Sequence, residues 1–400
     1  MKGFLLEKES NFKEVFIMDN IFSKKVEGIE ISGIRKFFNK VAEYPGAISL
    51  TLGEPDFKIP KEVKEAMKNA IDEDKTTYTP NAGILELRTA ISQYLLKDSI
   101  RYSENEICIT VGGSEALLCA FNAMINEGDK VLIPTVAYPA YESCAKLVGA
   151  EILTYKLKED FSIDMDSIRE IIKKEHPKLL VVSFPSNPTG AVMTKLQRDE
   201  LYSIVRDEDI LIISDEIYSA ISFENHYSIS QYDDIKDKVI LVSGFSKMFS
   251  MTGIRIGYIC ASESILKEVV KVHQYNVSCA PSIGQYGALA GLKEALYHCE
   301  IIKNEFKIRR DYVYGRLKAM GLEVELPKGA FYILPSIRKF NLTSEEFCNK
   351  LLQNKKVAIV PGSAFGIGGE GYIRISYCYS TENLKKALDS LEEFIKELTN

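Results

Sequence analysis

The sequence predicts an α/β protein whose larger part is built on a mainly parallel β-sheet and whose smaller part is α+β. In the middle of the chain, short runs rich in Val, Ile and Leu alternate with segments of helical periodicity. These runs are apolar almost throughout, which is typical of strands covered on both faces. Strand–helix repetition then implies parallel strands joined by right-handed crossovers. After about residue 290 this alternation stops, which indicates a second, smaller unit.

The expected strands of the larger part follow one another at intervals that leave room for a helix. Most of them are bounded by Pro, Gly, Asp or Asn, the residues that commonly end strands. Gly112 and Gly113 follow the first strand and open a segment of helical spacing, SEALLCAFNAMI. The predicted strands are residues 107–111, 130–133, 151–154, 179–184, 210–214 and 239–243.

The smaller unit is expected to contain a long helix over residues 295–320, strands within 321–337 and a C-terminal helix. The last helix has a cap at Ser380 or Thr381 and one apolar face, formed by Leu384, Leu388, Leu391, Ile395 and Leu398. We expect residues 1–60 to form an N-terminal arm and part of the small domain, residues 61–294 the large domain, and residues 295–400 the C-terminal small domain. The first seventeen residues are interpreted as a loosely held arm, with Met18 as an alternative start.

Composition narrows the class of protein. The 400 residues include 50 Lys and Arg against 56 Asp and Glu, a net charge of −6 that argues against a nucleic-acid or anionic-membrane surface. The sequence contains no run of about 18 apolar residues, so no membrane span is predicted. Charged residues interrupt every short apolar stretch near the N-terminus, which argues against a signal peptide. Eight cysteines without a Cys-x-x-Cys pair favour free thiols in a reducing cytoplasm. The four histidines lack metal-site spacing, so no metal is expected.

Ligands of parallel sheets bind beyond the carboxyl ends of the strands, and four polar segments follow predicted strands there: GGSEA, PSNPTG, DEIY and GFSKMFSMTGIRIG. Each segment alone has an ordinary interpretation as a helix cap, a turn, a paired carboxylate or a surface lysine. Together they provide an anion cradle, a hydrogen-bonding turn, a carboxylate and an amine at one edge of a sheet. This combination suits a single ligand.

Pyridoxal 5′-phosphate meets all four requirements. Its aldehyde forms a Schiff base with a lysine amine that is partly deprotonated. A carboxylate keeps its pyridine nitrogen protonated, which makes the ring a better electron sink. Its phosphate suits the N-terminus of a helix, and its 3′-oxygen needs a hydrogen-bond donor.

The segments SDEIY, GFSKMFSMTGIRIGY and GYIRISY resemble those of class I aminotransferases, within the fold-type-I family of pyridoxal-phosphate-dependent enzymes. The resemblance extends from ISGIRKF and LTLGEPDF to the C-terminal helix. It implies fold type I, with a mainly parallel seven-stranded sheet between helices. It also implies a cytoplasmic homodimer that moves an amino group between an L-amino acid and a 2-oxo acid, with glutamate and 2-oxoglutarate as one pair.

Positions in these motifs imply particular roles. Lys247 matches the Schiff-base lysine that also acts as the general base, and Asp215 matches the partner of the pyridine nitrogen. Tyr218 and Asn187 resemble the pair that hydrogen-bonds the 3′-oxygen. Tyr138, in VAYPAY, matches the aromatic residue that stacks on the coenzyme ring.

For the coenzyme phosphate, the resemblance implies Arg255, Ser246 and the turn formed by Gly113, Ser114 and Glu115. Many relatives have a serine three residues before the lysine, where this chain has Gly244. Ser243 or Ser246 could compensate for it.

For substrate and assembly, the resemblance implies Arg374 as the clamp on the α-carboxylate, because a planar guanidinium suits a carboxylate. Gly53 corresponds to a residue that lets the substrate approach closely, and Asn187 also lies at this site. Tyr78, in YTPNAG, resembles a tyrosine that reaches the coenzyme phosphate of the neighbouring subunit.

The segments IEISGIRKF, YTPNAGILELR, KVHQYNVSCA and DYVYGRL resemble N-acetyl-L,L-diaminopimelate aminotransferases of bacterial lysine synthesis. Aspartate aminotransferase is the alternative, and a C–S β-lyase of the same fold shares the lysine and the carboxylate. A non-catalytic pyridoxal-phosphate regulator would carry a DNA-binding module, of which the sequence has no sign. A nicotinamide dehydrogenase would need Gly-x-Gly-x-x-Gly, which VGGSEA does not supply.

Overall fold

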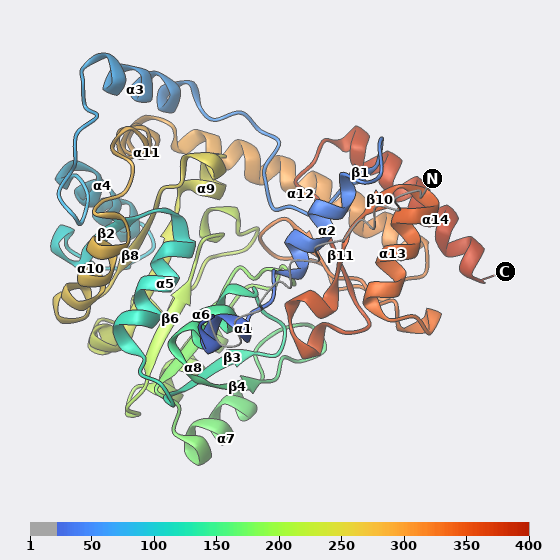
Figure 1. The fold of residues 1–400 in the computed structure, drawn as a ribbon, viewed down its shortest axis with the longest axis horizontal. Helices are drawn as coiled ribbons and strands as arrows, with labels where there is room; N and C mark the ends of the chain where they lie inside the picture. The colour runs from blue at the N-terminus through green and yellow to red at the C-terminus, as the bar shows by residue number, and fades with distance from the viewer. Residues whose placement is uncertain (1–21, 400) are drawn as a thin grey trace, which may run out of the picture.

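The computed structural model describes residues 22–399 (Figure 1). The expected arm of residues 1–17 and the alternative start at Met18 lie outside this range. The larger part of the chain surrounds a seven-stranded sheet with the strand order β2-β8-β7-β6-β5-β3-β4. Its strands are β2 (Ile107–Thr110), β3 (Lys130–Pro134), β4 (Glu151–Tyr155), β5 (Leu179–Ser183), β6 (Leu211–Asp215), β7 (Val239–Gly244) and β8 (Gly257–Cys260).

The mainly parallel sheet is confirmed, with one strand that the sequence did not predict. Strands β4, β3, β5, β6 and β7 pair in parallel, whereas β8 runs antiparallel to both β7 and β2. The close approach of β7, β8 and the helix that begins at Gly112 requires glycines. A Cβ at Gly244 would meet Cα of Gly257 at 2.8 Å, and a Cβ at Gly257 would meet the backbone carbon of Gly112 at 2.5 Å.

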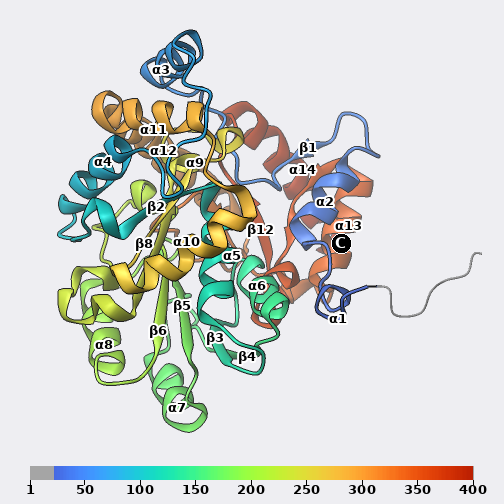
Figure 2. The same ribbon diagram turned by 60° about the vertical axis from the view of Figure 1, so that its left-hand side comes forward.

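Helices cover both faces of this sheet, as continuous apolar strands require (Figure 2). Alternate strand residues point to opposite sides: Val131 and Ile133 pack in one cluster, and Leu132 packs in another. The first face carries α5 (Gly112–Met124), α6 (Ala140–Val148) and α10 (Glu263–Val277). The other carries α7 (Met165–Glu175) and α8 (Lys195–Val205), together with α3 (Lys61–Asp72), α4 (Leu85–Leu96) and α11 (Ser282–Glu294).

The smaller part combines both ends of the described chain, so that blue and red segments lie side by side (Figure 1). Strand β1 (Ile48–Ser49) pairs with β10 (Val357–Ala358), and β11 (Val360–Pro361), β12 (Ile373–Ser376) and β9 (Tyr332–Ile333) form an antiparallel sheet. The accompanying helices are α1 (Lys24–Glu27), α2 (Gly33–Val41), α12 (Leu296–Ala319), α13 (Ser344–Lys355) and α14 (Thr381–Thr399).

The predicted apolar face of the last helix is largely confirmed, because Leu384, Leu388, Leu391 and Ile395 are buried. The prediction of strands within residues 321–337 was mostly wrong, because only β9 is regular there. Helix α12 contributes Cys299 to a core cluster of the larger part and Phe306 to the core of the smaller one. The domain limits at residues 60 and 294 stay a prediction. Within residues 22–399, no helix is long and apolar enough to cross a membrane.

Candidate active site

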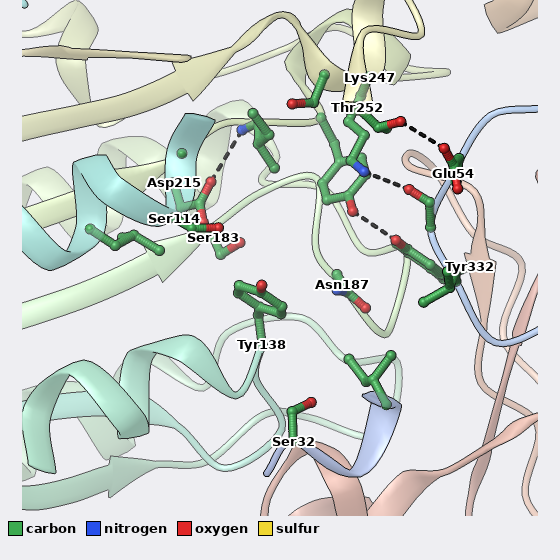
Figure 3. Close-up of a pocket in the computed structure, with 18 of the residues that line it drawn as sticks. Ser32, Glu54, Ser114, Tyr138, Ser183, Asn187, Asp215, Lys247, Thr252 and Tyr332 are labelled. Atoms are coloured by element: carbon green, nitrogen blue, oxygen red, sulfur yellow. Dashed lines mark hydrogen bonds between the residues drawn. The ribbon is translucent and has the colours of Figure 1, made fainter. Parts of the chain in front are cut away.

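A cavity of about 680 Å³ lies between the two parts of the molecule (Figure 3). The carboxyl ends of β5, β6 and β7 and the start of α5 meet there, and β12 and the segment after β1 close it from the other side. Its lining includes most of the predicted residues: Gly53, Gly113, Ser114, Tyr138, Asn187, Asp215, Tyr218, Ser246, Lys247, Arg255 and Arg374. The short helix α9 (Phe245–Met248), directly after β7, carries the lysine.

Lys247 projects into this cavity toward the segment that follows β1 (Figure 3). Its Nζ atom donates a hydrogen bond to the carbonyl oxygen of Gly53. Burial lowers the pKa of Lys247 to about 8, and the positive charges of Arg255 and Arg374 act in the same direction. This amine is therefore unprotonated near neutral pH far more often than an ordinary lysine, as a nucleophile or a general base requires.

Asp215 is the last residue of β6 and is only 5% exposed. Its Oδ2 accepts a hydrogen bond of 2.7 Å from the hydroxyl of Tyr141, and its Oδ1 accepts one of 3.2 Å from the N–H of Ile217. Burial raises the pKa of Asp215 to about 6, although the hydrogen bond from Tyr141 opposes the shift. A buried carboxylate of this kind needs a positively charged partner, which a protonated pyridine nitrogen would provide.

Arg255 lies beside the first turn of α5 in a left-handed conformation, with φ of 62°. Its Nη1 donates to the carbonyl of Thr252 at 3.0 Å and its Nη2 to that of Val111 at 3.4 Å. A Cβ at Gly112 would meet Nη2 at 2.6 Å, so only glycine allows this approach. The guanidinium and the unpaired N–H groups of a 13-residue helix thus form an anion cradle.

The two serines considered as replacements for the missing phosphate contact differ in position. Ser246 lines the cavity, whereas Ser243 donates its hydroxyl at 3.1 Å to the carbonyl of Glu216. A serine at position 244 would place its Cβ against Gly257 and the carbonyl of Ile256. The glycine is therefore a packing requirement in this chain.

Arg374 is the largest side chain in the fully buried core, with 1% exposure. Its Nη1 donates to Oδ1 of Asn187 at 3.0 Å, and its Nη2 donates to the carbonyl of Thr51. The rings of Tyr332 and Phe365 lie 4.5 and 4.8 Å from its Cζ. Its buried Nε has no hydrogen-bond partner. A buried N–H donor without a partner beside a cavity is suited to an anionic ligand.

Four tyrosines shape the rest of the cavity. The hydroxyls of Tyr218 and Tyr332 lie 2.8 Å apart, and the rings of Tyr138 and Tyr141 meet edge to face at 5.9 Å. A Cβ at Gly53 would lie 1.7 Å from the hydroxyl of Tyr332, so a side chain there would displace the tyrosine. The glycine at position 53 is therefore required by the packing of Tyr332.

Two predicted residues lie outside the cavity of the described chain. Tyr78 is 86% exposed on the segment between α3 and α4. The carboxylate of Glu115 turns away from the cavity toward His273 and Cys119. Glu115, Cys119 and His273 are the one group of potential metal ligands found within residues 22–399, and hydrogen bonds among them account for their proximity.

Sequence analysis missed several residues that line the cavity. They are Ser32, Ile34, Arg35, Phe38, Leu52, Glu54, Leu117, Tyr141, Ser183, Ile217, Thr252, Gly253 and Tyr332. Glu54 accepts a hydrogen bond of 2.9 Å from the hydroxyl of Thr252, which joins the two sides of the cavity. The spacing of Tyr138 and Tyr141, about one helical turn, was the available signal for Tyr141. Nothing in GAFYILP indicated that Tyr332 would face Tyr218.

A half-buried lysine and a buried carboxylate, set beside an anion cradle at the carboxyl edge of this sheet, define a pyridoxal-phosphate-dependent transferase of fold type I. Residues 45–391 match the family described as Aminotransferase class I and II, and the chain belongs to that family.

Individual relatives agree with this assignment. The chain is 44% identical to a probable N-acetyl-LL-diaminopimelate aminotransferase of Bacillus subtilis, over 94% of this chain and 96% of the relative. It is 39% identical to an aspartate aminotransferase of Pyrococcus abyssi, over 94% and 98% of the two chains. The solved structure of aspartate aminotransferase from Thermus thermophilus with maleate has a TM-score of 0.89 at 32% identity, covering 93% of this chain and 99% of that one.

Proposed function

We propose that this chain binds pyridoxal 5′-phosphate in the cavity described above. Arg255, Ser246 and the first turn of α5, with Gly113 and Ser114, would hold the phosphate, because a guanidinium and unpaired helix N–H groups favour an anion. Tyr138 would stack on the ring, and the carboxylate of Asp215 would hold the proton on the ring nitrogen. When bound, this group supplies a carbonyl carbon that joins to amines and a ring that accepts electrons.

Lys247 would perform two tasks with the same Nζ atom. Its depressed pKa supports a covalent attachment to the coenzyme, since the neutral amine is the nucleophile. Once the substrate amine has taken its place, the freed Nζ would accept the proton from the substrate Cα and return it on the other side of the transfer. Its contact with the carbonyl of Gly53 supports this role, because it keeps the amine at the substrate side of the cavity.

Asn187 and Tyr218 would donate hydrogen bonds to the 3′-oxygen of the coenzyme. The Oδ1 atom of Asn187 already accepts from Arg374, so its Nδ2 is the atom left to donate. Tyr218 shares its hydroxyl with Tyr332, which holds the phenol in place.

The observation that carries the aminotransferase proposal is Arg374. Its guanidinium is buried, has an Nε without a partner and lies in the same cavity as Lys247. A substrate α-carboxylate would satisfy this donor and would orient the Cα hydrogen toward Lys247. The backbone of Gly53, which lines the same cavity, would lie close to the bound substrate.

For the substrate, we propose the transfer of an amino group between N-acetyl-L,L-diaminopimelate and 2-oxoglutarate, in lysine biosynthesis. The 44% identity to the Bacillus subtilis relative over nearly the whole chain supports this choice. Aspartate aminotransferase is the second candidate, supported by the Pyrococcus abyssi relative and by the Thermus thermophilus structure with maleate. We also propose a cytoplasmic homodimer in which Tyr78 reaches the coenzyme phosphate of the other subunit.

Steady-state rates with N-acetyl-L,L-diaminopimelate and with aspartate, each against 2-oxoglutarate, test the substrate. We expect kcat/KM to be at least tenfold higher for the acetylated substrate. A preference for aspartate would replace the first candidate by the second. Release of a thiol from a β-thio amino acid, without formation of glutamate, would indicate a C–S β-lyase instead.

A further inference from the structure

The segment that carries Tyr78 is held to α10 and α11 by two side chains without exposed surface, His273 and Gln285. The Nε2 atom of His273 lies 2.9 Å from the carbonyl oxygen of Asn81. Gln285 accepts a hydrogen bond of 2.8 Å from the N–H of Ile84 and donates one of 3.1 Å to the hydroxyl of Thr79. Buried polar side chains therefore hold the backbone at Asn81 and Ile84 and the side chain of Thr79.

The imidazole ring of His273 lies between Glu115 and the carbonyl group of Asn81. A carbonyl oxygen only accepts, so Nε2 must carry a hydrogen toward Asn81. The Nδ1 atom lies 2.8 Å from Oε1 of Glu115, which also accepts at 3.2 Å from the thiol of Cys119. The hydrogen bond and charge of His273 hold the pKa of Glu115 below its ordinary value, although burial alone would raise it. The carboxylate is thus ionised, and each ring nitrogen of His273 faces an acceptor, Oε1 of Glu115 or the carbonyl oxygen of Asn81.

Glu115 connects His273 to the expected phosphate site. Its Oε2 accepts a hydrogen bond of 2.8 Å from the N–H of Val111, where the chain turns into α5. Gly113 and Ser114, which line the cavity, lie between Val111 and Glu115 in the sequence. Helix α10, which carries His273, lies across α5 in Figure 2 and packs against it. One chain of hydrogen bonds therefore runs from the first turn of α5 through Glu115 and His273 to Asn81.

We propose that Glu115 and His273 are positioning residues that fix the Tyr78 segment relative to the phosphate-binding turn of α5. This inference rests on the proposed function, in which the turn of α5 holds the coenzyme phosphate of its own subunit and Tyr78 reaches that of the other subunit. It also gives Glu115 a role different from the direct phosphate contact expected from the sequence. Because these hydrogen bonds already hold the segment in place, it does not have to become ordered when the coenzyme binds. The entropic cost of ordering, which would weaken binding, is therefore avoided.

Two variants of His273 separate its hydrogen bond to Glu115 from its hydrogen bond to Asn81. Asn places a donor near the position of Nδ1, so His273→Asn keeps the bond to Glu115 and loses the bond to Asn81. Gln reaches the position of Nε2, so His273→Gln keeps the bond to Asn81. In the coenzyme-free protein we expect faster hydrogen exchange over residues 78–84 in His273→Asn than in His273→Gln. Equal exchange of this segment in the wild type and in His273→Asn would overturn the proposal.

Coenzyme affinity provides the second test, by a double-mutant cycle with Tyr78→Phe. Glu115→Gln keeps the shape of the side chain and removes its charge, so it serves if His273→Asn does not fold. We expect about a tenfold loss of pyridoxal-phosphate affinity in either variant, and less than a twofold further loss when the Tyr78→Phe substitution is already present. The full tenfold loss in the Tyr78→Phe background would show that the pair does not act through Tyr78.

Cys348→Ala is the matched control, because it removes a buried thiol in α13, in the core of the smaller part. It should lower Tm without changing coenzyme affinity, and a change as large as that of His273→Asn would overturn the proposal. The wild type separates this inference from the function on which it rests. A wild type that binds no pyridoxal phosphate contradicts the proposed function, whereas normal binding in both wild type and His273→Asn contradicts only the link.

Discussion

Arg374 donates a hydrogen bond of 3.0 Å from its Nη1 to Oδ1 of Asn187, although the two residues come from different sheets. Arg374 is in β12 of the small sheet, and Asn187 follows β5 of the large one. The residue expected to hold the substrate carboxylate is therefore fixed by the residue expected to hold the coenzyme oxygen. A ligand that shifts one of these side chains should therefore also shift the other.

Replacement of Arg374 by Lys should impair substrate binding much more than coenzyme binding. A lysine keeps the charge but loses the planar fork that holds Asn187, Thr51 and a carboxylate together. Loss of one partner of a buried charged hydrogen bond costs about 2–5 kcal/mol, so kcat/KM for the amino acid should fall by roughly 30-fold or more. Steady-state kinetics and a coenzyme titration of the same variant measure the two effects. Equal losses in both would contradict the assignment.

Replacement of Lys247 by Ala should remove the covalent attachment and the proton transfer together. Wild-type protein should be yellow, and borohydride should fix the coenzyme on the peptide that contains Lys247. Turnover should fall by at least about 10³-fold, since a general base alone contributes about 10²–10⁴-fold. Lys195→Ala, a change to an exposed lysine in α8, is the control and should keep its activity. Transamination near the wild-type rate in Lys247→Ala would exclude the mechanism.

Attachment of the coenzyme to coenzyme-free protein should depend on pH with a midpoint of about 8, the pKa of Lys247. The neutral amine is the nucleophile, so the rate should rise with pH through this value and level off above it. An ordinary lysine would show its midpoint near 10.4. Stopped-flow absorbance at several pH values measures the profile, and a midpoint near 10 would show that burial does not tune this amine.

Asp215 should make the coenzyme-free protein less stable as pH rises from about 4 to 6. The folded carboxyl has its pKa raised to about 6, so the folded state binds a proton that the unfolded state has lost. This stabilisation is complete at low pH and is lost as pH rises, by roughly 3 kcal/mol in all. Asp215→Asn should lack this loss, so its advantage in Tm over the wild type should grow between pH 4 and 6 and stay constant above. With coenzyme, its turnover should fall far more than its affinity. A constant difference in Tm would contradict the raised pKa.

Tyr78 should complete the site of the other subunit. Tyr78→Phe should weaken coenzyme binding by about 1–2 kcal/mol, the value of one hydrogen bond to a charged group. Mixing inactive Lys247→Ala with a more severe Tyr78 variant should restore activity in heterodimers, because one of the two sites then receives neither damaged group. A monomer that binds coenzyme fully, or mixtures without recovery, would exclude the arrangement.

Much of the fold was predictable because burial on both faces leaves a clear pattern in the strands. Leu179–Ser183 and Val239–Gly244 are buried at every position, and their apolar runs are visible in the sequence. Strand β8 was missed, because its four residues follow Arg255 so closely that they read as the end of the lysine segment. The two-residue strands β9, β10 and β11 are too short to leave a periodic pattern.

The site was predictable where a residue follows a strand in a motif, and much less so where packing chooses its direction. Lys247 and Asp215 line the cavity as expected, since the ends of parallel strands share one edge of the sheet. The direction of Glu115 depends on His273, which lies 158 residues further along the chain. Tyr332 approaches Tyr218 only because the small sheet packs onto the large one. No local pattern encodes such contacts.

The pairing of β1 with β10 has a consequence for protein synthesis. Ile48 lies beside Val357, and Thr51 and Gly53 follow this strand toward Arg374 and Lys247. Residue 48 leaves the ribosome long before residue 357 is synthesised. Strand β1 therefore stays unpaired with β10 while all strands of the large sheet are translated. A nascent chain stalled before β10 contains every strand of that sheet, but it lacks β12 and therefore Arg374, which line the substrate side of the cavity. The capacity to accept an amino acid therefore arises only when translation is nearly finished.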